Sequence, residues 1–151
     1  MSNPDLSIVI PTYNSIDKMS ETLDSLVRTM DLVDGEVVFV DDCSKDDTYD
    51  RLVEFSARFP NWKVLKLAQN SGSAAAPRNM GIENASGKWI YFLDSDDVLE
   101  PKAIEEALGV AIKYNYDVVR TSLKVRMGDG SVRGGDLIPK WDAIRDPKSR
   151  V

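Results

Sequence analysis

At 151 residues the chain is long enough for one domain with a substantial core, and its formal net charge of −6 argues against a general nucleic-acid-binding surface. It contains no histidine, which excludes the usual catalytic triads and histidine-based metal sites. Its single cysteine, Cys43, cannot form an internal disulfide, and neither a signal peptide nor an apolar run of about 20 residues is visible. We therefore expect a cytoplasmic protein with no nucleic-acid partner and no transmembrane segment in this chain.

Short apolar strands alternate with amphipathic helices along the chain. The predicted strands are 6–10 (stopped by Pro11), 36–40, 62–67, 89–93 and 117–127. The predicted helices are about 17–30, 44–59, one opening at Pro77, and 101–114. Ser44 and Asp47 have the spacing of a capping box for the second helix, and Gly128–Ser131 is typical of a hairpin turn. The side chains expected to face inward from the helices are Met19, Leu23, Leu26, Val27, Met30, Tyr49, Leu52, Val53, Phe59, Ile104, Leu108, Ala111 and Ile112.

This alternation predicts an α/β fold with a Rossmann-like, mostly parallel sheet and helices on both faces. In such a sheet the ligand crevice lies beyond the carboxyl ends of the strands. Four polar segments fall at those ends, and they are residues 11–14, 41–44, 70–79 and 94–97. The sequence therefore predicts a ligand site at this edge of the sheet.

The most informative of these segments follows the strand Trp89–Leu93, whose five apolar or aromatic residues predict a strand buried on both faces. Three carboxylates come directly after it, Asp94, Asp96 and Asp97. Such crowded carboxylates repel one another unless a cation lies among them, and oxygen ligands of this kind suit Mg²⁺ or Mn²⁺. The alternative is an acidic turn that caps the next helix.

The polar segments together resemble those of the inverting family 2 glycosyltransferases, whose nucleotide-binding half has the GT-A fold. The matching stretches are Ser7–Asn14, Val38–Ser44 with Asp47–Thr48, Asn70–Gly72, Pro77–Gly81 and Leu93–Asp97. The similarity covers residues 5 to about 125, and the order and spacing of the stretches are more specific than any one of them. The Asn-Ser-Gly and Pro-Arg-Asn variants are similar to those of enzymes that build or decorate bacterial cell-envelope polymers.

The resemblance implies roles for individual residues. Thr12, Tyr13 and a rim carboxylate at Asp42 would hold the nucleotide base, normally uracil. Asp41 would instead orient the loop, and Tyr13 also fits a core position. Arg78 would lie near the diphosphate or clamp an aspartate. The implied nucleotide-binding residues are Pro11, Thr12, Tyr13, Asn14, Asp42, Asn70, Gly72, Arg78, Asp94, Ser95 and Asp96, and the implied ligands of a Mn²⁺ or Mg²⁺ ion are Asp94, Asp96 and Asp97.

The implied activity is metal-dependent, inverting transfer of a sugar from a UDP-sugar to a hydroxyl of an acceptor saccharide or glycopolymer. The acceptor implies a place at the inner face of the membrane. We expect a nucleotide-sugar-binding domain over 5–127, and a hairpin with a partly irregular tail over 128–151 that continues into an absent acceptor-binding segment. The family places its general base well after the metal motif, so no catalytic residue is assigned. The acidic residues of the tail are expected to be solvated, and they are Asp129, Asp136, Asp142 and Asp146.

Two alternative interpretations of the function stay open. Leu93–Val98 also resembles the first motif of haloacid-dehalogenase-type phosphatases, with Asp94 as the nucleophile. That family normally has glycine where Asp97 stands, and it needs a lysine and an acidic pair downstream for which little chain remains. The third reading is a non-catalytic module that binds a nucleotide sugar.

Overall fold

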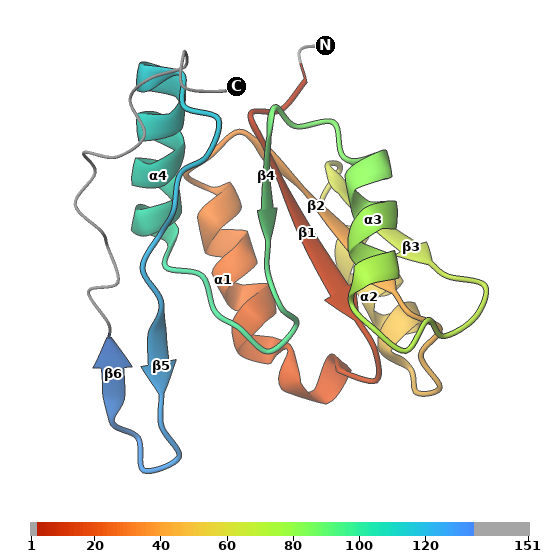
Figure 1. Ribbon diagram of the computed structural model, residues 1–151. Helices are drawn as coiled ribbons and strands as arrows, with labels where there is room; N and C mark the ends of the chain where they lie inside the picture. The colour runs from red at the N-terminus through yellow and green to blue at the C-terminus, as the bar shows by residue number, and fades with distance from the viewer. Residues whose placement is uncertain (1–2, 135–151) are drawn as a thin grey trace, which may run out of the picture.

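The computed structural model describes residues 3–134, and a four-stranded parallel sheet in the order β3-β2-β1-β4 forms its centre (Figure 1). The strands are β1 (Leu6–Thr12), β2 (Gly35–Asp41), β3 (Trp62–Lys66) and β4 (Trp89–Phe92). All three pairings are parallel, as the spacing of the apolar segments predicts. The carboxyl ends of the strands therefore meet at one edge.

Helices cover both faces of the sheet, which confirms the expected fold class. A short 3₁₀ turn, η1, precedes the helices, and the bounds are η1 (Ile16–Lys18), α1 (Ser20–Met30), α2 (Thr48–Ser56), α3 (Ala75–Asn84) and α4 (Pro101–Tyr114). Side chains of α1, α2 and α4 share the larger core cluster with one face of β1 and β2. Helix α3 packs on the opposite face, through Met80 against Val9, Val38 and Val40.

Helix α3 lies unusually close to β1 because it contains a glycine at the contact. A Cβ atom placed on Gly81 would lie 2.2 Å from Cγ1 of Val9, well inside van der Waals contact. The absence of a side chain at Gly81 thus allows the backbone of α3 to approach the sheet. This approach sets the position of Arg78, one turn earlier in the same helix.

Strand β1 continues through Pro11, which the sequence predicts as its stop. The N–H of Leu93 donates to the carbonyl oxygen of Val9 (3.1 Å), and the N–H of Asp42 donates to that of Thr12 (2.8 Å). The N–H and C=O groups of successive residues in a strand point to opposite neighbouring strands. The backbone nitrogen of Pro11 therefore faces β4, as the backbone groups of Val9 do. Since the β1–β4 pairing ends at Val9, the missing N–H of Pro11 costs the sheet no hydrogen bond.

Several local predictions are wrong. Strand β4 is covered on one face only, because α3 lies over β1 and β2, and Ile90 and Phe92 are therefore 40% and 44% exposed. Val53 and Ile112 are also exposed, because each lies at the margin of its helix's apolar face. Helix α2 begins at Thr48 without a capping box, since the hydroxyl of Ser44 donates to Asp41 instead.

A buried charged cluster lies at the opposite end of the sheet from the predicted site. The carboxylate of Glu36 accepts hydrogen bonds from the hydroxyls of Ser7 (2.7 Å) and Ser86 (2.8 Å), and it pairs with Nζ of Lys63 (2.8 Å). Burial alone would raise the pKa of Glu36, but these hydrogen bonds outweigh it and lower the pKa to about 2. Gly87 is tightly packed here, since a Cβ would lie 2.5 Å from the backbone nitrogen of Ser7.

The predicted strand 117–127 is much shorter in the structure. It is reduced to β5 (Lys124–Arg126), which pairs antiparallel with β6 (Val132–Gly134), and Gly130 in the connecting turn has φ of 81°. The guanidinium of Arg126 binds Glu21 at the start of α1 (3.0 Å) and holds this hairpin against the domain. Asp129 lies exposed in the turn, whereas Asp136, Asp142 and Asp146 lie outside the described residues.

Candidate functional site

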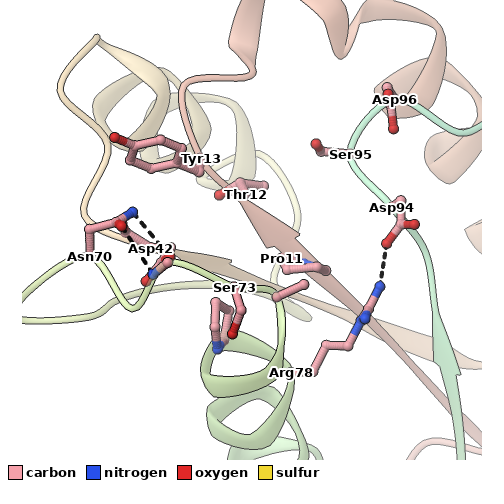
Figure 2. A pocket seen from close by; sticks show the side chains of 13 residues that line it. Pro11, Thr12, Tyr13, Asp42, Asn70, Ser73, Arg78, Asp94, Ser95 and Asp96 are labelled. Atoms are coloured by element: carbon pink, nitrogen blue, oxygen red, sulfur yellow. Dashed lines mark hydrogen bonds and ion pairs between the residues drawn. The ribbon is translucent and has the colours of Figure 1, made fainter.

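A pocket of about 470 Å³ opens at the carboxyl ends of β1, β2 and β4 (Figure 2). Its lining residues are Pro11, Thr12, Tyr13, Asp42, Asn70, Gly72, Ser73, Ala74, Pro77, Arg78, Asp94, Ser95 and Asp96. Ten of the eleven residues expected to bind a nucleotide are in this set. Asn14 and Asp97 are not among the lining residues. Tyr13 is 42% exposed and therefore not a core aromatic residue.

Asn14 supports the pocket from behind. It adopts a left-handed conformation with φ of 45°, its side-chain oxygen accepts the N–H of Lys45 (2.8 Å), and its own N–H donates to the hydroxyl of Ser44 (2.9 Å). These bonds join the loop after β1 to the loop after β2. Asn14 thus positions Tyr13 through the backbone.

The two adjacent aspartates after β2 have different environments. Asp41 is fully buried, accepts the N–H (2.9 Å) and the hydroxyl of Ser44, and lies 3.9 Å from Nζ of Lys66. Asp41 therefore holds the turn that contains Cys43, whose φ is 59°. Asp42 is the one that reaches the pocket.

The carboxylate of Asp42 also anchors the loop after β3. Its Oδ1 accepts a hydrogen bond from the backbone N–H of Ser71 (2.8 Å). Its Oδ2 accepts hydrogen bonds from the side-chain amide of Asn70 (3.1 Å) and the hydroxyl of Ser71 (3.0 Å). The residue is only 4% exposed, so the expectation of a freely accessible rim carboxylate is wrong. These bonds tie together two walls of the pocket that are 28 residues apart in sequence.

Arg78 and Asp94 form an ion pair across the pocket, as Figure 2 shows. Helix α3 supplies the guanidinium, which also lies 5.9 Å from the ring centroid of Phe92 on β4. Within residues 3–134, Nε of Arg78 is buried and has no hydrogen-bond partner. The Arg78 side chain as a whole is 36% exposed, so the other N–H groups of its guanidinium can donate to an anionic ligand in the pocket.

Helix α1 holds the acidic turn 94–99 in place. The hydroxyl of Thr22 donates to the carbonyl oxygen of Ser95 (3.1 Å), and the N–H of Leu99 donates to the hydroxyl of Ser25 (3.1 Å). The N–H of Asp97 closes the turn onto the carbonyl oxygen of Asp94 (3.1 Å). Partial burial, together with the charges of Asp94 and Asp96, raises the pKa of Asp97.

The three carboxylates of this turn do not converge on one point. Among residues 3–134, no group of three acidic, histidine or cysteine side chains is placed to hold a metal ion. The set Asp94, Asp96 and Asp97 is therefore not assembled as a complete metal site, because Asp97 lies outside the pocket and Asp94 pairs with Arg78. Asp94 and Asp96 still fit an ion that takes one or two carboxylates and completes its shell with water and substrate phosphates, as Mg²⁺ commonly does.

Some contributors are not among the residues predicted from sequence. Ser73, Ala74 and Pro77 line the pocket, and their position between Gly72 and Arg78 in one polar segment is a usable signal. Thr22 and Ser25 are polar residues on the inward face of a predicted amphipathic helix, which is a second signal. Thr48 accepts the N–H groups of Ser15 (3.0 Å) and Ile16 (3.2 Å), a contact that local sequence does not reveal.

Comparison with known proteins identifies the family. Residues 7–146 match the family described as glycosyl transferase family 2. The chain belongs to this family. Membership confirms the resemblance and removes the support for a phosphatase with Asp94 as nucleophile.

Curated relatives share most of this chain. It is 40% identical over 126 residues to the poly(ribitol-phosphate) beta-glucosyltransferase of Bacillus spizizenii, covering 83% of this chain and 20% of that protein. It is 36% identical to the poly(ribitol-phosphate) beta-N-acetylglucosaminyltransferase TarS of Staphylococcus aureus, covering 82% and 22%. The chain thus spans about a fifth of the length of these two relatives.

Solved structures agree with the fold. The structure of S. aureus TarS 1–349 in complex with UDP-GlcNAc aligns with a TM-score of 0.65 at 34% identity, covering 76% of this chain and 32% of that one. A mannosyltransferase from Pyrobaculum calidifontis, solved with GDP-Man and Mn²⁺, aligns with a TM-score of 0.63 at 22% identity and shows the fold alone, over 74% of this chain and 33% of that one. In the described part of the chain, no helix combines the length and apolarity needed to cross a membrane.

Proposed function

We propose that this chain is the donor-binding part of a glycosyltransferase that transfers a sugar from a UDP-sugar to a hydroxyl of a cell-envelope glycopolymer. The observation that carries the proposal is the gathering of ten predicted nucleotide-binding residues around one pocket. The names of the relatives, which act on poly(ribitol-phosphate), support a glycopolymer as acceptor. An acceptor polymer at the inner face of the membrane would require the enzyme to work in the cytoplasm.

In this proposal the loops after β1, β2 and β3 receive the uridine. Tyr13 offers an exposed ring beside Asp42 and Asn70, as Figure 2 shows. A uracil ring would stack on the tyrosine while its N–H donates to the Asp42 carboxylate, which has lone pairs left beside its loop contacts. Thr12 and Asn70 complete that wall.

Arg78 and the acidic turn would receive the diphosphate and the metal. The exposed N–H groups of the Arg78 guanidinium are donors for a phosphate oxygen. Mn²⁺ or Mg²⁺ would neutralise charge that develops on the diphosphate as the sugar–phosphate bond breaks. Asp96, with Asp94, would hold the ion in the pocket, and Ser95 would present its backbone beside the ribose. We assign no residue of this chain as the general base, since the chain spans only about a fifth of the length of the two relatives.

Thermal unfolding with ligand tests the donor class. At about 100 times the dissociation constant, UDP or a UDP-sugar with Mn²⁺ should stabilise the fold by about 2.7 kcal/mol and raise the melting temperature by about 5–10 °C. GDP at the same concentration serves as the control for base selection. An unchanged melting temperature with every UDP-sugar at millimolar concentration plus Mn²⁺ would refute the proposal.

The metal role is tested separately through Asp96. Asp96→Asn removes one negatively charged ligand, so the gain in UDP affinity that Mn²⁺ produces should fall by about tenfold or more, while metal-free UDP binding changes little. The matched control is Asp31→Asn, which changes an exposed carboxylate at the carboxyl end of α1. Equal Mn²⁺ dependence in Asp96→Asn and the wild type would remove Asp96 from the metal site.

A further inference from the structure

The charge of the chain is unevenly distributed. Residues 118–134 contain four cations and one carboxylate, in a chain whose formal net charge is −6. The cations are Arg120, Lys124, Arg126 and Arg133, and all four are exposed. Within residues 3–134 only Arg126 of these four forms an ion pair. The segment therefore presents local positive potential on an otherwise acidic protein.

This segment is linked to the pocket wall through helix α1. Arg126 binds Glu21 at the start of α1, and the next residue, Thr22, donates to the carbonyl oxygen of Ser95 in the pocket wall. In Figure 1 the turn of the β5–β6 hairpin points to the same end of the molecule as the tips of β1 and β4. The hairpin is thus connected to the acidic turn through the start of α1.

The pairing register places the cations on both faces of the hairpin. Arg133 lies opposite Val125, so these two side chains share one face. Lys124 and Arg126 share the other face, where Arg126 contacts α1. An elongated polyanion running along the hairpin edge would meet cations from both faces.

We infer that the β5–β6 hairpin is a contact surface for an anionic acceptor polymer, whose backbone phosphates pair with Arg133 and Lys124. Arg126 positions the hairpin through Glu21. The inference rests on the proposed function and identifies the acceptor as a phosphodiester polymer. A phosphodiester chain fits better than an extended anionic membrane, because the rest of the protein is acidic and a flat anionic surface would approach those charges as well.

The experiment measures binding of a fluorescent ribitol-phosphate oligomer to the 151-residue chain by polarisation, at low and high ionic strength. The variant Lys124→Glu/Arg133→Glu should bind at least about tenfold more weakly at low salt and should depend less on salt. The control Lys88→Glu/Lys113→Glu makes the same change in net charge at exposed sites at the other end of β4 and α4, and it should bind as the wild type does. The UDP-induced melting shift should be the same in all three proteins.

Each other outcome overturns the inference. Equal oligomer binding by the hairpin variant excludes the surface, and equal loss in the control variant shows that only net charge matters. Binding to phosphatidylglycerol vesicles but not to the oligomer would make the hairpin a membrane contact. If the wild type shows the UDP shift but binds no oligomer, the hairpin inference fails while the proposed donor site stands, whereas a missing UDP shift counts against the proposed function itself.

Discussion

Asp42 combines two tasks in a single side chain. Its carboxylate accepts three hydrogen bonds from Asn70 and Ser71, and it also lines the pocket in which we place the uracil. A buried carboxylate with several donors around it has a fixed orientation. Any ligand that donates to Asp42 therefore meets an acceptor that is already oriented.

We predict that Asp42→Asn weakens both nucleotide binding and the fold. The amide has a donor where the carboxylate accepts, so one bond to the 70–71 loop is lost at a cost of about 1–3 kcal/mol. Calorimetry with UDP and a urea titration measure the two effects. Ser71→Ala is the matched control, since it removes a loop hydrogen bond but leaves the carboxylate in place.

An unchanged UDP affinity in Asp42→Asn would exclude Asp42 from the site. An equal loss of affinity in Ser71→Ala would show that Asp42 acts only by holding the loop.

Sequence reasoning assigned Asp42 to the base and Asp41 to the loop, but it could not show that Asp42 also anchors the loop after β3. Both follow an apolar strand, and only the three-dimensional contacts show that Asp41 bonds to Ser44 while Asp42 bonds to Asn70 and Ser71. Partners 28 or 29 residues away leave no local signal. The same limit applies to Asp97, which the motif groups with Asp94 and the turn places outside the pocket.

Among the elements, α3 has the least tolerance for change. Its backbone approaches β1 so closely that a methyl group at Gly81 would overlap Val9. Because Arg78 lies one turn earlier, any displacement of α3 also moves the guanidinium relative to Asp94.

We predict that Gly81→Ala destabilises the protein by about 1–3 kcal/mol through overpacking and also weakens UDP binding. Gly109→Ala, in the middle of α4 with no heavy atom within 4 Å of the new Cβ, should instead stabilise it by about 0.5–1 kcal/mol through helix propensity. Chemical denaturation of both variants gives the sign of each effect. A stabilising Gly81→Ala would contradict the close packing described here.

The helices and the parallel strands could be predicted because their apolar periodicity is strong, and α4 begins and ends at the predicted residues. The exposure of β4 could not, since a run of apolar residues does not tell whether a helix lies over it. Strand 117–127 was overestimated for a related reason. Its residues have strand propensity, but only three of them find a partner strand.

On the scale of the whole molecule, the two ends of the sheet have different electrostatic properties. The pocket end has carboxylates arranged around open space, whereas the far end has Glu36 enclosed by its donors. The pKa of Glu36 is lowered from 4.5 to about 2, so its ionised form stabilises the fold. That stability is fully present above the unfolded-state pKa and is lost as the pH falls through about 2.

We predict that Glu36→Gln destabilises the fold at pH 7 by on the order of 3 kcal/mol, and that the difference from the wild type shrinks as the pH is lowered from 4.5 towards 2. Urea titrations at several pH values measure the trend. Glu54→Gln, an exposed carboxylate on α2, should show no comparable effect. A difference that stays constant down to pH 2 would mean that the charge of Glu36 is not what stabilises this end.

The proline in β1 has a consequence for the shape of the pocket. Any residue other than proline at position 11 would have an N–H group able to donate to the carbonyl oxygen of Leu93. The pairing of β1 with β4 would then extend by one more hydrogen bond. Pro11 has no N–H for that hydrogen bond, and the pairing of the two strands ends beside the pocket. The pocket therefore opens just beyond the hydrogen bond from the N–H of Leu93 to the carbonyl oxygen of Val9.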